Sequence, residues 1–204
     1  MTMSGQTDKK TGDTKLRNAA VCAAVFAAVL LLILLAKKLL LTPEKAVGVN
    51  PEVLQYRSEV EEACREQGIG EYAELMLAMM QQESGGLLPD VFQCSESPFN
   101  LLYERSPNAI DDPAYSISVA AETFAYCLER AQCGSIRDKE GIKIALQEYN
   151  FGNDYSVWAR ENYGKYTPEN AEEFSLNMQT ELGWEAYGDP LYAEHVLQYY
   201  QEGD

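Results

Sequence analysis

The stretch QQESGG, residues 81–86, decides the fold around it, and it continues directly into LLPDVFQCSES, residues 87–97. Apolar residues at helical spacing over residues 72–82 predict a buried helix that ends on Glu83. The two glycines that follow allow a sharp turn, because glycine adopts positive backbone dihedrals without a steric clash. A second acid, Asp90, comes seven residues after the first. We therefore expect an acid at a buried helix end to face a loop that carries another carboxylate.

Helical patterns also cover most of the chain on either side of this stretch. Strand-like alternation is scarce, and any sheet is expected to be short and to lie near residues 88–102. The sequence therefore predicts a mainly α domain without internal repeats. Helices are expected over residues 53–64, 72–82, 113–128 and 138–149, from the N-cap Thr167 onward, and over residues 190–200.

A long apolar run precedes this domain. Residues 19–36, AAVCAAVFAAVLLLILLA, contain no charge, and LLL follows after two lysines. Because a membrane-spanning helix needs about 20 apolar residues, we expect a single-pass transmembrane helix at the N-terminus. The alternative is a cleaved signal peptide, although its apolar region is usually shorter and is followed by a small-x-small site.

These boundaries predict four segments. They are a cytoplasmic tail over residues 1–18, a membrane anchor over 19–41, a linker over 42–51 and one folded domain over 52–204. The basic cluster before the anchor predicts a cytoplasmic N-terminus, with the domain on the outer side of the membrane.

The charge is strongly acidic. The formal net charge is −16, and from Thr42 onward 10 basic residues stand against 30 acidic ones, a net charge of −20. Nucleic acid is not an expected partner, because binding to phosphates needs a basic surface. An acidic domain is compatible with an uncharged or cationic substrate, and equally with simple solubility.

Four cysteines fall in the folded domain, at Cys64, Cys94, Cys127 and Cys133. Outside the cell they could form two disulfides in any of three pairings. Pairing Cys127 with Cys133 would clip a helix end, and pairing Cys64 with Cys94 would tie an early helix to the loop after Glu83; four separate thiols are the alternative. Zinc is disfavoured, since the chain has no CxxC motif and its one histidine is His195, so no metal or cofactor is expected.

The two acids suggest a reaction. A carboxyl group at the end of an apolar helix is partly desolvated, and desolvation raises its pKa because it disfavours the charged form. A glycosidase needs such an acid to protonate the leaving oxygen near neutral pH. We therefore expect Glu83 to act as the acid and Asp90 either to activate water or to stabilise positive charge. The alternative for Glu83 is an ordinary solvated helix-end glutamate.

Polar and aromatic residues near these acids suit a sugar. Hydroxyl, amide and carboxylate groups bind sugar hydroxyls and acetamido groups, and a tyrosine ring stacks on a sugar ring. The motif EYNFG, residues 148–152, brings such groups from far along the chain. The candidate substrate-binding residues are Ser84, Gln93, Ser95, Glu96, Ser97, Tyr149 and Asn150.

The ordered motifs QESGG, PDVFQCSES, DPAYSISVAAETF, EYNFG and YGDPLYAEHVLQYY resemble the lysozyme-like muramidase domain of bacterial cell-wall hydrolases carried by conjugative elements. They are more distantly similar to goose-type lysozymes and soluble lytic transglycosylases. The resemblance implies a lysozyme-like, mostly α fold, with Glu83 at the position of the catalytic acid and Asp90 at the second acidic position. Two positions depart from the pattern: Phe92 stands where methionine is common, and Cys94 where serine is common.

This resemblance implies a membrane-anchored muramidase that hydrolyses the β-1,4 bond between N-acetylmuramic acid and N-acetylglucosamine in peptidoglycan glycan strands. Its role would be to open the cell wall locally for a conjugative transfer apparatus, a type IV secretion channel. Two alternatives are kept. One is a lytic transglycosylase that forms 1,6-anhydro products, and the other is a non-catalytic glycan-binding or scaffold module of the transfer machine.

Overall fold

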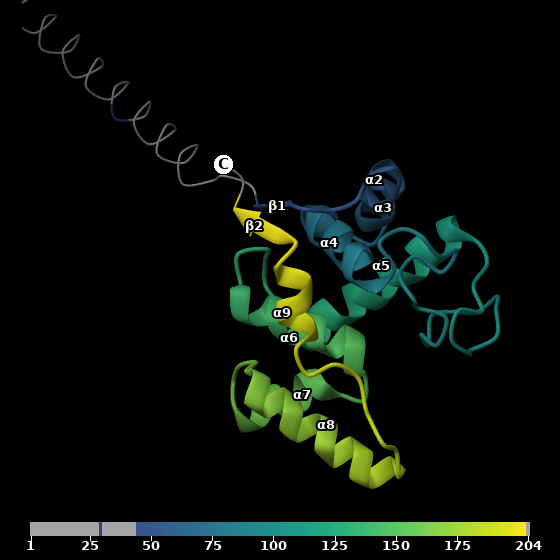
Figure 1. The fold of residues 1–204 in the computed structure, drawn as a ribbon. Coiled ribbons are helices and arrows are strands. Elements are labelled where there is room, and N and C mark those ends of the chain that lie inside the picture. The colour runs from purple at the N-terminus through teal and green to yellow at the C-terminus, as the bar shows by residue number, and fades with distance from the viewer. Residues whose placement is uncertain (1–28, 30–43, 203–204) are drawn as a thin grey trace, which may run out of the picture. The chain divides into compact units, whose positions relative to one another are not determined.

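The computed structural model of the chain describes Val29 and residues 44–202, and this part is built mainly from helices (Figure 1). The mainly α class is therefore confirmed for the described residues. The elements are β1 (Glu44–Ala46), α2 (Pro51–Leu54), α3 (Arg57–Glu66), the 3-10 helix η1 (Gly70–Tyr72), α4 (Ala73–Glu83), α5 (Pro113–Arg130), α6 (Lys139–Phe151), α7 (Tyr155–Asn162), α8 (Pro168–Leu182), α9 (Tyr192–Leu197) and β2 (Tyr200–Glu202).

Helix α4 lies at the centre of the part that carries the first acid. Six consecutive side chains, residues 75–80, are fully buried, so this helix is apolar on all its faces rather than on one stripe. It packs against α2, α3, α9 and β1. Glu83 is its last residue, and the buried surroundings of α4 therefore fix where that carboxyl group emerges.

Helix α6 connects the remaining helices. It packs against α5, α7 and α9, and Figure 1 shows it between the α2–α4 end and the end formed by α7 and α8. Asp138 caps its N-terminus by accepting a hydrogen bond from the backbone N–H of Gly141, and Gly152 ends it with a φ of 60°. The last turn of α6 carries Tyr149 and Asn150 toward the loop after α4.

The sheet is not where the sequence pattern placed it. Residues 88–102 contain no strand; the strands of the described part are β1 and β2, which pair antiparallel with Ala46 opposite Tyr200. The prediction of a linker over residues 42–51 is also wrong in part, because β1 and the first residue of α2 lie within it. The compact unit runs from Glu44 to Glu202, and its two ends are joined by backbone pairing that local patterns do not reveal.

One predicted helix is divided in the structure, and one helix was missed. The pattern over residues 53–64 is divided into α2 and α3, which meet at Gln55 and Tyr56. Helix α7 was not predicted, because its eight residues carry a mixed polar and aromatic sequence without a clear apolar stripe. Aromatic packing stabilises it instead: Tyr155 and Trp158 of α7 both lie against Phe174 of α8.

The expected disulfides are absent among the four described cysteines, all of which are free thiols. Tertiary packing gives each a different neighbour. The sulfur of Cys64 lies 3.2 Å from the sulfur of Met76, Cys94 lies against Ser116, and Cys133 lies 3.5 Å from the hydroxyl of Tyr72. Cys127 faces the core, so its nearness to Cys133 in sequence does not bring the sulfurs together.

No helix within the described residues is long and apolar enough to cross a membrane. The predicted tail and anchor, residues 1–41, lie outside the described residues except for Val29.

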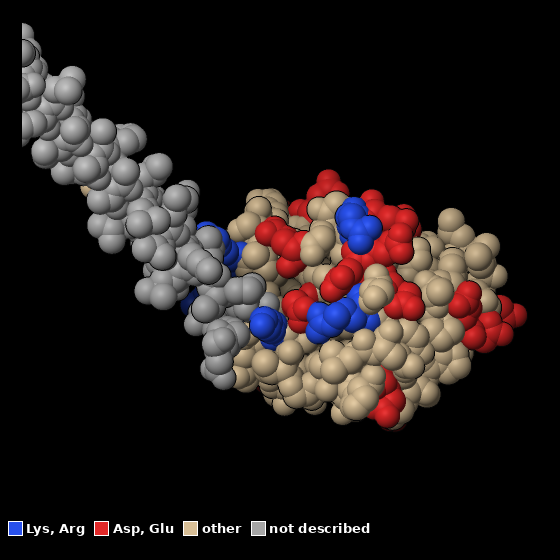
Figure 2. All heavy atoms as spheres, turned by 90° about the horizontal axis from the view of Figure 1, so that it is seen from above, with Lys and Arg blue, Asp and Glu red and all other residues tan. Residues whose placement is uncertain are grey.

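On the face seen in Figure 2, acidic side chains cover more of the surface than basic ones, although uncharged residues cover most of it. Helix α3 contributes to this imbalance, since Glu59, Glu61, Glu62 and Glu66 are all exposed. Repulsion among such charges opposes the compact state, and dissolved salt screens it.

Candidate active site

Glu83 is a partly buried carboxyl group held by a tyrosine from the far end of the chain. One of its oxygens, Oε1, accepts a hydrogen bond from the hydroxyl of Tyr192, at 2.5 Å. Tyr192 opens α9 and is itself 2% exposed, so the donor has little freedom to move. The hydrogen bond fixes the orientation of the carboxyl group at the end of α4.

The surroundings of Glu83 raise its pKa to about 7. Burial is the largest cause, because it disfavours the charged carboxylate; the hydrogen bond from Tyr192 lowers the pKa, and the negative charge of Asp90 raises it. The group is therefore about half protonated at neutral pH. A protonated carboxyl group at that pH is what a general acid needs.

Tyr149 supports this arrangement from α6. Its ring stacks on that of Tyr192, with centroids 6.3 Å apart and planes inclined by 18°, and its hydroxyl donates a hydrogen bond to the backbone oxygen of Phe92 at 3.1 Å. One side chain thus contacts both the residue that holds Glu83 and the loop that follows it. One face of the tyrosine that was expected to stack on sugar lies against another tyrosine, and its contact with sugar stays a prediction.

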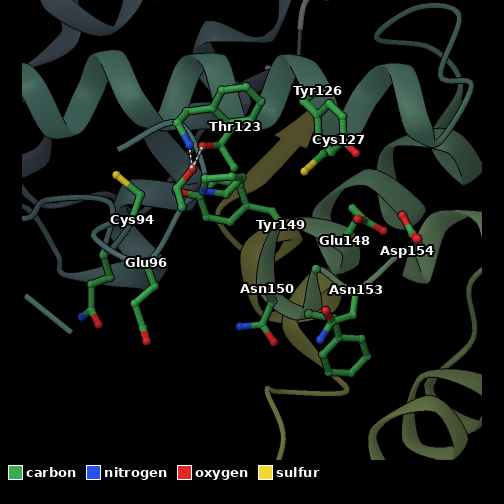
Figure 3. Close-up of a pocket in the computed structure, with 16 residues that line it drawn as sticks. Cys94, Glu96, Thr123, Tyr126, Cys127, Glu148, Tyr149, Asn150, Asn153 and Asp154 are labelled. Atoms are coloured by element: carbon green, nitrogen blue, oxygen red, sulfur yellow. Dashed lines mark hydrogen bonds between the residues drawn. The ribbon is translucent and has the colours of Figure 1, made fainter. Parts of the chain in front are cut away.

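A pocket of about 570 Å³ lies beside this arrangement, between the loop after α4, α5 and the end of α6. Figure 3 shows Glu96 on one side, Glu148, Asn153 and Asp154 on the other, and Tyr149 between them. Glu83 is not among the residues that line the pocket. Gln93 and Tyr149 line it and also connect it to the surroundings of Glu83. The side-chain amide of Gln93 donates to the backbone oxygen of Glu83 at 2.6 Å.

Most of the predicted substrate-binding residues line this pocket, namely Gln93, Glu96, Ser97, Tyr149 and Asn150. Ser84 and Ser95 do not. The hydroxyl of Ser84 donates to the backbone oxygen of Val91 at 2.7 Å and accepts from Gly86, so it shapes the turn. Ser95 is 1% exposed, and its hydroxyl donates to Asp90. The geometry gives these two serines a place in the loop scaffold rather than at the pocket wall.

Asp90 is buried, with 1% of its surface exposed, and both of its oxygens accept hydrogen bonds from the protein. The backbone N–H of Cys94 and the hydroxyl of Ser116 donate to Oδ1 at 3.1 and 2.8 Å. The backbone N–H and the hydroxyl of Ser95 donate to Oδ2 at 3.0 and 2.5 Å. Its expected direct role in the reaction stays a prediction, and the carboxylate faces the loop interior.

Several lining residues were not predicted from the sequence. They include Glu148, which is 4% exposed and accepts a hydrogen bond from the backbone N–H of Ser156 at 2.6 Å. Burial raises the pKa of Glu148. It directly precedes Tyr149 and Asn150, so adjacency in the EYNFG motif was the available signal. Asn153 and Asp154 directly follow this motif and had the same signal. Thr123 and Tyr126 gave none, because only the packing of α5 against α6 brings them to the pocket.

The turn before α9 sets the position of Tyr192. The side-chain oxygen of Asn150 accepts from the backbone N–H of Asp189 at 2.7 Å, and Asp189 Oδ2 lies 2.6 Å from Nδ1 of His195. Gly188 cannot carry a side chain here, because a Cβ would lie 2.4 Å from the ring of Phe151. The pocket residue Asn150 is thereby connected to the helix that carries Tyr192.

A family described as lysozyme-like matches residues 50–203. The chain is 36% identical over 160 residues to the bifunctional muramidase/DL-endopeptidase CwlT of Bacillus subtilis, covering 78% of this chain and 45% of that protein. It is 32% identical over 157 residues to the uncharacterized membrane protein YocA of the same species. That match covers 69% of this chain and 65% of YocA. A crystal structure of a protein similar to an NLP/P60 family lipoprotein, from Staphylococcus aureus, superposes with a TM-score of 0.62 at 32% sequence identity. The superposition covers 78% of this chain and 55% of that one. The chain thus spans about half to two thirds of the length of these relatives.

Proposed function

Because the chain belongs to the lysozyme-like family, we propose that residues 44–202 form a muramidase domain that cleaves the β-1,4 bond between N-acetylmuramic acid and N-acetylglucosamine in peptidoglycan. The observation that carries this proposal is Glu83, a partly buried carboxyl group whose pKa is raised to about 7 and whose orientation is fixed by Tyr192. The adjacent polar pocket, and the muramidase named among the relatives, support a glycan substrate.

Glu83 acts as the general acid. Its proton passes to the glycosidic oxygen as the bond to the anomeric carbon breaks, and the leaving sugar departs with a free hydroxyl. Positive charge then develops at the anomeric carbon, where a water molecule adds. The proton that this water releases returns to the carboxylate of Glu83, which restores the acid. The amide and hydroxyl groups of Gln93, Ser97 and Asn150 offer hydrogen bonds to acetamido and hydroxyl groups of the glycan.

A lytic transglycosylase is the second candidate, and the surroundings of Asp90 favour it over a route in which a second carboxylate activates water. That reaction needs one catalytic glutamate, because the 6-hydroxyl of the muramic acid attacks its own anomeric carbon and returns its proton to the same glutamate. Asp90 already accepts four hydrogen bonds from the protein, so it is poorly placed to activate water. The product is then a 1,6-anhydro sugar instead of a reducing end.

Mass spectrometry of purified peptidoglycan digested by the full-length protein separates these candidates, with Glu83→Gln as the matched control. We expect muropeptides with reducing ends from the wild type and none from the variant. Anhydro-muropeptides would move the assignment to the transglycosylase. If the wild type binds the glycan and releases nothing, a non-catalytic scaffold module is the remaining assignment.

We further propose that residues 19–41 anchor this domain to the cell membrane with the N-terminus in the cytoplasm, and that it opens the cell wall for a conjugative secretion channel. The apolar run over residues 19–36 and the membrane protein among the relatives support the anchor, and the resemblance of the motifs supports the channel. In protoplasts, which lack the cell wall but keep an unbroken membrane, protease added outside the cell should digest residues 44–202. Conjugation frequency should fall when Glu83→Gln replaces the wild type at equal protein level.

A further inference from the structure

The loop between α4 and α5, residues 84–112, contains no helix or strand, yet it forms one rim of the pocket. Local backbone turns satisfy some of its backbone groups, and side chains must supply hydrogen bonds to others. Asp90 is the centre of this network. Its oxygens accept from the backbone at Cys94 and Ser95 and from the hydroxyls of Ser95 and Ser116, which are also buried.

The two serines extend the network to both ends of the loop and to α5. The hydroxyl of Ser116, on α5, also accepts from the backbone N–H of Phe92 at 3.1 Å. The hydroxyl of Ser95 accepts from the backbone N–H of Ile110 at 3.0 Å. One buried carboxylate thus ties the start of the loop, its end and the neighbouring helix at a single point.

A group that takes a proton from water or attacks a sugar must reach the reacting atoms with a free lone pair. A carboxylate has about four lone-pair positions, and four N–H and O–H donors of the protein occupy those of Asp90, with the thiol of Cys94 3.7 Å from Oδ1. With 1% of its surface exposed, Asp90 has no direct route to a bound glycan, whereas Glu83 is only partly buried.

We propose, on the basis of the function proposed above, that Asp90 is a positioning residue: it ties residues 90–97 to α5 and so holds the pocket rim against Glu83. The rim begins at Gln93, whose backbone has a φ of 46°, a conformation that side-chain-bearing residues rarely adopt. Its side-chain amide contacts the backbone of Glu83 only while this turn is kept. Glu96 and Ser97 follow at the pocket wall.

The test compares Asp90→Ala, Ser116→Ala and Glu83→Gln in the full-length protein, with Glu104→Gln as a control at an exposed acid of the same loop. Three quantities are measured: the rate of muropeptide release with and without sodium azide, its pH profile, and hydrogen exchange of residues 90–97. We expect Asp90→Ala and Ser116→Ala to lower the rate about 10- to 100-fold, because small misplacements in a site cost that much. Both should speed exchange of the loop, whereas Glu83→Gln should stop the reaction without changing exchange.

The measurements with azide and at different pH show whether Asp90 positions the loop or takes part in the reaction itself. A small anion replaces a missing catalytic carboxylate but cannot rebuild the network, so azide should not restore Asp90→Ala. The loss of activity at alkaline pH should move to lower pH in Asp90→Ala, which lacks the charge that raises the pKa of Glu83, and should stay in place in Ser116→Ala.

Rescue by azide with a glycosyl azide product would overturn the proposal. Wild-type exchange of residues 90–97 in Asp90→Ala would overturn it as well. If the wild-type protein releases no muropeptides, the proposed function fails, while the exchange measurement still decides whether Asp90 holds the loop.

Discussion

At the scale of single residues, Glu83 and Tyr192 determine what the site can do. The hydrogen bond between them joins residues that are 109 positions apart, and it lowers a pKa that burial raises. These opposing effects leave the pKa of Glu83 near 7. At neutral pH the group can therefore both donate a proton and accept one back.

Tyr192→Phe is expected to raise the pKa of Glu83, because it removes a donor that favours the carboxylate. A hydrogen bond to a charged group is worth about 1.5–3 kcal/mol, which corresponds to a shift of about one pKa unit or more. The alkaline loss of activity should therefore move to higher pH, and a pH–rate profile checks this. Tyr199→Phe, at a partly buried tyrosine near the C-terminus, is the control; equal profiles for Tyr192→Phe and the wild type would contradict the prediction.

Glu83→Gln is expected to stabilise the fold at pH 8. The folded-state pKa of about 7 lies above the ordinary value of 4.5, so ionisation of Glu83 destabilises the native state progressively as pH rises from about 4.5 through 7. A shift of this size corresponds to at most about 3 kcal/mol. Thermal unfolding of both proteins at pH 8 and pH 4 checks the prediction. The gain should be present at pH 8 and nearly vanish at pH 4, and equal midpoints at pH 8 would contradict it.

At the scale of elements, the turn after α4 determines whether the loop can start beside Glu83. Gly86 has a φ of 73°, and a Cβ there would lie 2.4 Å from the backbone oxygen of Glu52 in α2. The close approach of two backbone segments, in addition to the positive φ, therefore demands glycine at this position.

Gly86→Ala should destabilise the protein more than Gly183→Ala, its matched control. Gly183 has a similar φ of 69°, but a Cβ there would meet nothing within 4 Å, so alanine should cost about 1–2 kcal/mol of unfolding free energy from the left-handed conformation alone. The clash with a backbone adds to this at Gly86. Urea unfolding of both variants measures the difference, and equal losses of stability would show that α2 moves aside easily.

At the scale of the whole molecule, net charge sets a general condition for stability. The chain carries a formal charge of −16, and acidic side chains cover more of the face seen in Figure 2 than basic ones do. Repulsion of this kind falls with ionic strength, because salt shortens the distance over which exposed charges interact.

Sodium chloride is therefore expected to raise the thermal midpoint at pH 7.5, between about 10 mM and 150 mM salt, where the screening length falls from about 30 Å to 8 Å. The same titration at pH 4.4, near the sequence pI of about 4.4, is the control, because the net charge is close to zero there. A midpoint that falls with salt at pH 7.5 would show that attractive ion pairs such as Arg57 with Glu74 outweigh the general repulsion.

The sequence alone predicted the parts that local patterns encode. Helical spacing and caps located α3 to α6 and α8, and the sequence pattern predicted that α4 ends on Glu83 beside a glycine turn. These features depend on residues a few positions apart, so a linear reading can find them. The fold class follows from them, because helices that each bury an apolar face must pack on one another.

Only the tertiary structure decided which distant groups meet. The partner of Glu83 is Tyr192, which lies 109 positions further along the chain, and the strands that pair lie at opposite ends of the folded unit. The same packing keeps the four thiols apart and turns Asp90 and Ser95 inward. Burial and hydrogen-bond partners depend on contacts between elements, and it is these contacts that leave Glu83 partly buried beside Tyr192 and Asp90 fully buried among loop donors.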